Sequence, residues 1–121
     1  MNRVPRLVAV VAGLSFIALG LWAFFDPRSF YERLATYPPY NRHLFHDIGA
    51  FQLGIGAALL LALKWRDALF VALAGAGVGS AVHAISHWWD RDLGGRSSDP
   101  WALSLLAVIV LWAASERRHS S

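Results

Sequence analysis

Four histidines lie inside or at the start of two apolar segments of this chain: His43, His46, His83 and His87. An ionisable side chain within a membrane-spanning segment is costly and normally faces a bundle interior, so it marks a candidate functional site. Two histidines at positions i and i+4 of a helix can bind one metal ion, and imidazole suits zinc, copper and iron. We therefore treat the four imidazoles as candidate ligands of a transition metal.

Helical periodicity places two aspartates beside these histidines. Asp47 lies four residues after His43, and Asp90 lies three residues after His87, so each shares a helix face with its histidines. Each carboxylate would either bind the metal or orient a histidine ring. Because the chain has no cysteine, the expected ligands are nitrogen and oxygen atoms. A b-type haem held by one histidine from each segment is the alternative, since it needs no attachment motif.

The two histidine groups are expected to meet at one end of a helix pair. A tight polar turn joins segments 42–63 and 68–89, so they should run antiparallel, and His46 and His83 each lie about one turn (roughly 6 Å) from the same end. Small residues share the histidine faces: Ala50, Gly54, Ala57, Ala58, Gly75, Ala76, Gly79 and Ser80. Small faces let helices approach closely in lipid. We predict that these two segments form the tight central pair.

The composition predicts a membrane protein. Of 121 residues, 56% are apolar and only 16% are charged. A membrane-spanning helix needs about 20 largely apolar residues. Four segments reach or approach this length, at 4–25, 42–63, 68–89 and 100–115. We predict a single integral membrane domain over residues 1–121, an all-α, antiparallel four-helix bundle in the lipid bilayer.

The basic residues flank the apolar segments, which argues against nucleic acid as a partner despite the net charge of +3. At such positions their side chains can reach lipid headgroups. We expect the first segment to be retained rather than cleaved as a signal peptide, because bulky Leu21 and Trp22 follow the weak cleavage sequence 18–20. With the N-terminus inside, six basic residues face the cytoplasm and five face outward, which favours cytoplasmic termini.

The segment between the first two apolar runs predicts a short helix. Ser29 and Glu32 fit a capping box, and the aromatic residues that follow are spaced for one amphipathic face. The helix would lie at the membrane interface, or it would fold onto the bundle as an ordinary connection. Asn41 is the expected cap of the second long helix. Asp99 is the expected cap of the fourth, with Pro100 in its first turn.

The start of the second apolar run resembles a known family. The run NRHLFHDIGAFQLGIG, residues 41–56, looks like the polar-then-glycine opening of the second helix in the DoxX-like group of small four-helix bacterial membrane proteins. The overall layout is similar, and the usage of Ala, Arg, Gly and Trp is typical of actinobacterial proteins. The resemblance implies a multi-pass protein of the bacterial plasma (inner) membrane. Some members are linked to quinol oxidation or other respiratory complexes, but no catalytic set carries over.

The sequence is therefore compatible with two functions. The first is a membrane protein that binds a transition metal or haem at the six histidines and aspartates. The second is an accessory or assembly subunit of a larger, respiratory membrane complex, in which these residues form a structural hydrogen-bond network. Homo-oligomers are compatible with both, and an enzymatic use of the metal stays open. A transporter or channel is disfavoured, because only one end of the bundle carries polar groups.

Overall fold

The computed structural model describes residues 2–65 and 67–119. These residues form five α-helices and one short 3₁₀-helix, and no strand: α1 (Val4–Phe25), α2 (Pro27–Arg33), α3 (Arg42–Leu61), η1 (Ala62–Lys64), α4 (Ala68–Trp89) and α5 (Asp99–His119). Four of them are long and apolar enough to cross a membrane, with η1 extending α3. The predicted all-α bundle of four long helices is confirmed, and the chain is a multi-pass membrane protein.

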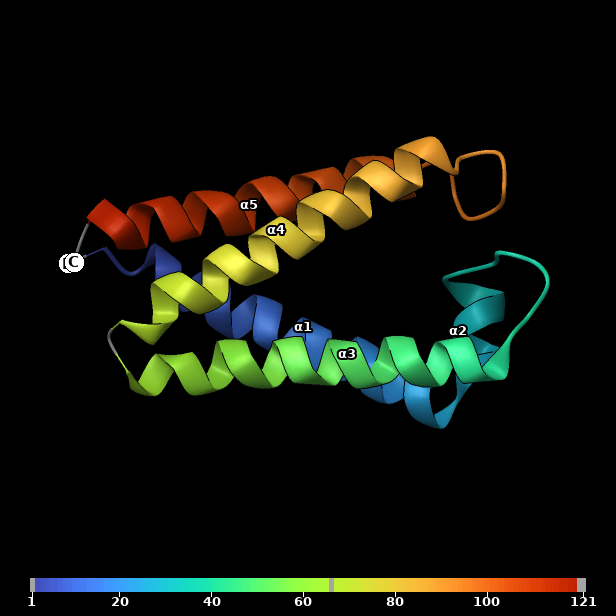
Figure 1. Cartoon of the computed structure of the whole chain (residues 1–121), viewed down its shortest axis with the longest axis horizontal. Helices are drawn as coiled ribbons and strands as arrows, with labels where there is room; N and C mark the ends of the chain where they lie inside the picture. The colour runs from blue at the N-terminus through green and yellow to red at the C-terminus, as the bar shows by residue number, and fades with distance from the viewer. Residues whose placement is uncertain (1, 66, 120–121) are drawn as a thin grey trace.

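The long helices are arranged as two tight pairs that diverge from each other (Figure 1). α1 packs along α3, and α4 packs along α5, whereas α3 and α4 make few contacts. In Figure 1 the green α3 and the yellow α4 are close at the turn that joins them and separate toward the opposite end. The prediction that these two helices form the tight central pair is therefore wrong.

Glycine contacts explain the pairing of α1 with α3. A Cβ added at Gly49 would lie 2.8 Å from the carbonyl oxygen of Gly20, and one added at Gly56 would lie 2.8 Å from that of Gly13. The two glycines of each helix are seven residues apart, which is two helical turns. The backbones of α1 and α3 therefore touch at their glycines, with larger side chains such as Leu53 and Leu60 packed beside them, as expected for helices that associate in lipid. In α4, Gly77 leaves room for the Leu111 side chain of α5.

Three of the glycines that the sequence favoured for α3–α4 packing face open space instead, whereas Ala76 and Ser80 of the same set are buried. A Cβ added at Gly54, Gly75 or Gly79 would meet no heavy atom within 4 Å. α3 carries small residues on two faces, and helical periodicity identifies both faces without ranking them. The face with Gly49 and Gly56 packs against α1, so the face with Gly54 is left toward the gap.

The outer surface of the bundle is apolar, as a lipid-facing surface must be. Large apolar side chains of α4 and α5 are 61–67% exposed, among them Val71, Val82, Leu105 and Val108. The buried core is built mainly from alanine and leucine where the helix pairs meet, including Leu59. In water so large an apolar surface would be a liability, whereas in a bilayer it contacts acyl chains.

The helix α2 folds onto the bundle through Phe30, whose ring lies 5.2 Å from that of Trp22 and 5.8 Å from that of Phe45. The capping-box prediction is wrong, because the helix begins earlier. The side chain of Asp26 accepts from the amide of Ser29, and Pro27 occupies the first turn. Proline is favoured there because its missing N–H is not needed at a helix start.

The caps of the long helices follow the sequence more closely. The Asn41 side chain accepts from the amide of Leu44 at 3.2 Å, so the predicted cap of α3 is confirmed. Asp99 is the first residue of α5 rather than its cap, a shift of one position. Both described chain ends lie at the same end of the bundle, where Asn2 donates to the Glu116 carboxylate (Figure 1). Which side of the membrane they face stays a prediction.

We expect Gly49→Ala to lower the free energy of unfolding by about 1–3 kcal/mol, because the added methyl group meets backbone atoms of α1. Gly54→Ala is the matched control on the same helix: its methyl group enters open space, and the change should lie within about 0.5 kcal/mol of zero or be stabilising. Unfolding in mixed micelles, followed by far-ultraviolet circular dichroism, measures both. Equal destabilisation by the two variants would contradict the glycine contact of α1 with α3.

Candidate functional site

The last turns of α4 bring two histidine rings into contact. Side chains at i and i+4 lie on one helix face, and here the Nε2 atoms of His83 and His87 are 3.1 Å apart. The ring centroids are separated by 4.8 Å, and the rings meet edge to face. This part of the sequence prediction, a histidine pair on one face of the helix, is present as expected.

A tyrosine from a distant part of the chain completes a hydrogen-bonded row. The hydroxyl of Tyr37 lies 3.0 Å from Nδ1 of His87. If the hydroxyl donates to Nδ1, then His87 carries its proton on Nε2 and donates to Nε2 of His83. In the reverse arrangement His83 donates to His87, which donates to the Tyr37 oxygen. Both directions satisfy the two contacts of the row, so Tyr37, His87 and His83 form a continuous chain.

Tyr37 keeps its proton at neutral pH. Burial of its hydroxyl raises the pKa above the usual value of 10.0, and the nearby negative charges of Asp99 and Asp90 raise it further. The phenol is therefore the neutral, donor-capable form across the physiological range. It can serve either as donor to His87 or as acceptor from it.

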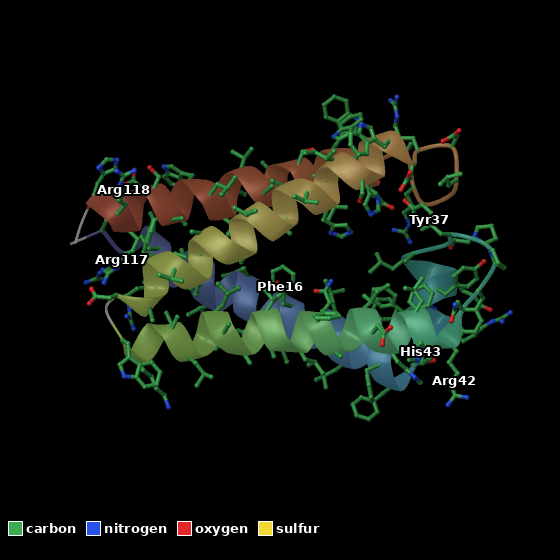
Figure 2. The ribbon with its side chains drawn as sticks, in the orientation of Figure 1. Phe16, Tyr37, Arg42, His43, Arg117 and Arg118 are labelled. Carbon is green, nitrogen blue, oxygen red and sulfur yellow. The ribbon has the colours of Figure 1, made fainter. Side chains whose placement is uncertain are left out.

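Contacts between two loops hold Tyr37 in place. The amide of Gly95, in the α4–α5 loop, donates to the Thr36 carbonyl at 2.9 Å, and the Arg96 guanidinium donates to the Arg33 carbonyl. Gly94 and Gly95 have φ angles of 150° and 75°, which only glycine adopts without strain. A Cβ at Gly95 would also collide with the Tyr37 hydroxyl. Figure 2 shows Tyr37 directly beneath the α4–α5 loop.

The sequence placed Tyr37 on the amphipathic face of the short helix between the first two apolar runs, not at the histidine site. In the structure α2 ends at Arg33, so Tyr37 lies in the loop that follows and that part of the prediction is wrong. Tyr37 lies fifty residues before His87, and no spacing argument connects the two. The one sequence signal was the adjacent pair Gly94-Gly95, because glycine is favoured where a loop takes a positive φ angle or approaches another backbone closely. The structure shows both features at this pair.

The other predicted ligands lie in separate places. His43 is paired with Asp47 at 3.5 Å, with the two side chains 83% and 54% exposed, and such an exposed pair contributes little stability. His46 packs against the ring of Phe24 on α1 at 5.0 Å. Asp90 ends α4, its amide donating to the Ser86 carbonyl. Among residues 2–65 and 67–119, no three His, Asp or Glu side chains are grouped closely enough to hold one metal ion.

A cleft of about 910 Å³ separates α3 from α4. Its walls are mainly apolar, with glycine and alanine from both helices, and Asp47 of α3 and His83 of α4 border it together. Figure 2 shows Phe16 of α1 between the two helices, where it lines the cleft. Gln52 also lines it, and its Oε1 atom is buried without a hydrogen-bond partner in the part of the chain that the structure describes. The cleft is thus apolar with a few polar atoms.

A second, smaller pocket of about 310 Å³ lies on the other side of the histidine pair. Tyr37 and His87 line this pocket, whereas His83 lines the cleft. The hydrogen-bonded row of three side chains therefore joins two cavities of different character. Two converging imidazoles in such a row can chelate an ion or pass a proton from one ring to the next.

Comparison with known proteins yields no match: no family model, no curated protein and no solved structure resembles this chain significantly.

The pKa of Tyr37 can be measured directly. We expect Tyr37 to stay largely protonated at pH 10, where an ordinary tyrosine is half ionised, because burial and two aspartates disfavour its phenolate. The chain has three tyrosines, so the difference in tyrosinate absorbance near 295 nm between the protein and its Tyr37→Phe variant isolates this residue. A difference titration centred at or below pH 10 would show that the hydroxyl is not held as described.

Proposed function

We propose that this multi-pass membrane protein binds a transition-metal ion between His83 and His87. The supporting observation is the 3.1 Å separation of their Nε2 atoms. Bonds from zinc to imidazole nitrogen are about 2.0–2.1 Å long, so two such nitrogens on one ion lie roughly 2.9–3.4 Å apart. The two nitrogens are thus separated by the distance that a chelating pair requires, and an ion would replace the proton that otherwise joins them.

Tyr37 would act on the metal through His87. When Nε2 binds an ion, the proton of a neutral imidazole resides on Nδ1, and the Tyr37 oxygen at 3.0 Å is its acceptor. Such outer partners fix the tautomer and the orientation of a ligating ring. With two protein ligands, the ion would keep positions for water or for a molecule entering from the cleft that His83 borders. Zinc, copper and iron all accept this donor set.

The geometry supports a metal ion over a b-type haem. Axial histidines bind haem iron from opposite faces, whereas His83 and His87 lie on one face of one helix. A haem held by one histidine from each helix would need His43 or His46 to face the cleft. Among the described residues that line the cleft, His83 is the one histidine. His43, His46, Asp47 and Asp90 stay predicted ligands that a metal would have to draw together.

A structural role of the same residues, in an accessory or assembly subunit of a larger membrane complex, is the second candidate. The observation in its favour is that the Tyr37–His87 hydrogen bond lies beside the loop contact from Gly95 to Thr36. All of these contacts hold the α2–α3 connection against the end of α4. In this role the two histidines and the tyrosine would stabilise the fold without binding an ion.

Metal titration of the purified, EDTA-stripped protein in detergent tests the first candidate. Cobalt(II) reports binding through its visible absorption bands, and zinc is then measured by competition. His83→Ala and His87→Ala should abolish stoichiometric binding, because each leaves a single ligand. Tyr37→Phe should weaken binding by about 10–100-fold, the usual effect of removing an outer hydrogen-bond partner.

His43→Ala is the matched control, because this exposed histidine lies on α3, where it is paired with Asp47, whereas His83 and His87 lie on α4. Unchanged binding in His43→Ala together with loss in His83→Ala supports the two-histidine site. Loss in all histidine variants would instead indicate that the larger predicted set binds the ion. If the wild-type protein binds no metal and both His83→Ala and Tyr37→Phe lower its thermal stability, the metal-binding proposal is contradicted and the structural role is supported.

A further inference from the structure

The smaller pocket differs from the cleft in its charge. It lies between the end of α4 and the start of α5, where the loop that joins them meets the α2–α3 connection. Its walls combine cationic, hydroxyl and aromatic side chains: Arg91, Arg96, Ser97, Trp88, Trp101 and Tyr37. Among the residues that the structure describes, no carboxylate lines the pocket, so the charged groups of its lining are the guanidinium ions of Arg91 and Arg96.

Each of these guanidinium ions uses only part of its hydrogen-bond donors within the described part of the chain. Arg91 uses Nε to donate to the Trp88 carbonyl at 3.1 Å, and its guanidinium carbon lies 5.4 Å from the centre of the Trp88 ring. The terminal nitrogens of Arg91 have no hydrogen-bond partner among the residues that the structure describes. Arg96 donates from one terminal nitrogen to the Arg33 carbonyl. A carbonyl satisfies a donor without neutralising its charge.

The carboxylates of the same loop region do not pair with the arginines either. Asp90 and Asp99 lie close enough to influence the Tyr37 hydroxyl, and Asp92 follows Arg91 directly in the chain. None of these three aspartates forms an ion pair with Arg91 or Arg96 within the described part of the chain. The Asp99 carboxylate accepts from the backbone amide of Arg96, not from its guanidinium. Two cationic groups therefore line one small cavity without an anionic partner.

We propose that this pocket binds a phosphate ester anion. Arginine presents a planar fork of donors that matches phosphate oxygens, and such charge-assisted hydrogen bonds are among the strongest in proteins. The Ser97 hydroxyl adds a neutral donor, and the tryptophan rings offer an apolar surface to the organic part of the ester. A volume of about 310 Å³ is at the lower end for ligand sites and accommodates a phosphate with a small substituent.

Two sources can supply this anion. The pocket lies at the ends of two membrane-spanning helices and next to tryptophans, which favour the headgroup level of a bilayer. A glycerophospholipid headgroup would therefore reach it from the membrane, and a soluble phosphate ester would reach it from the water. Both present anionic phosphate oxygens to Arg91 and Arg96, the lipid headgroup as a phosphodiester and glycerol 3-phosphate as a monoester.

The experiment uses the full-length, EDTA-stripped protein, so that no metal contributes to phosphate binding. Calorimetric titration with glycerol 3-phosphate probes the soluble source. Native mass spectrometry with phosphatidylglycerol, against diacylglycerol as the phosphate-free lipid, probes the membrane source. Arg91→Gln should weaken binding of the recognised probe at least about tenfold, the loss of one charge-assisted hydrogen bond. Arg91→Lys keeps the charge without the fork and should give a smaller loss.

Arg42→Gln is the matched control, because Arg42 starts α3 at the same end of the bundle and points away from the pocket (Figure 2). His83→Ala, which removes the proposed metal site but not the pocket lining, should keep wild-type phosphate affinity. Binding of either probe with selective loss in the Arg91 variants supports the proposal and identifies the source. The proposal is overturned if neither probe binds, if the folded Arg91 variants bind as wild type, or if Arg42→Gln loses as much.

Discussion

The glycine contact between α1 and α3 is the constraint on which the remaining arrangement depends. Because Gly20 and Gly49 let the two backbones touch, one face of α3 is fully used, and its second small face is left free. α4 packs against α5 in turn, through Gly77. The two helix pairs then meet closely at one end only, and the gap between α3 and α4 becomes the cleft that His83 borders.

At the end of the bundle where α3 and α4 are separated, contacts between loops join the two helix pairs. The Gly95 amide on the Thr36 carbonyl, the Arg96 guanidinium on the Arg33 carbonyl and the Tyr37–His87 hydrogen bond all join the α2–α3 connection to the α4–α5 side. These contacts hold the Tyr37 hydroxyl against His87. They also build the walls of the cationic pocket, so both candidate sites depend on the same loop contact.

The row from Tyr37 to His83 separates two environments with different chemistry. On one side lies an apolar cleft within the membrane spans, and on the other lies a small cationic pocket at their ends. His87 takes part in both, through Nε2 toward His83 and as a wall of the pocket. A metal ion that replaced the shared proton would therefore fix the tautomer of His87, whereas the arginine donors of the pocket do not depend on the histidine pair.

The sequence by itself determined the number and the approximate limits of the long helices, the Asn41 cap and the pairing of His83 with His87. Each of these depends on contacts within one helix or on the length of an apolar run. Which small face of α3 would meet a partner, and that Tyr37 would reach His87, were decided only by the tertiary structure. Helical periodicity defines a face without naming the helix that covers it, and an irregular loop has no periodicity that could point to a side chain fifty residues away.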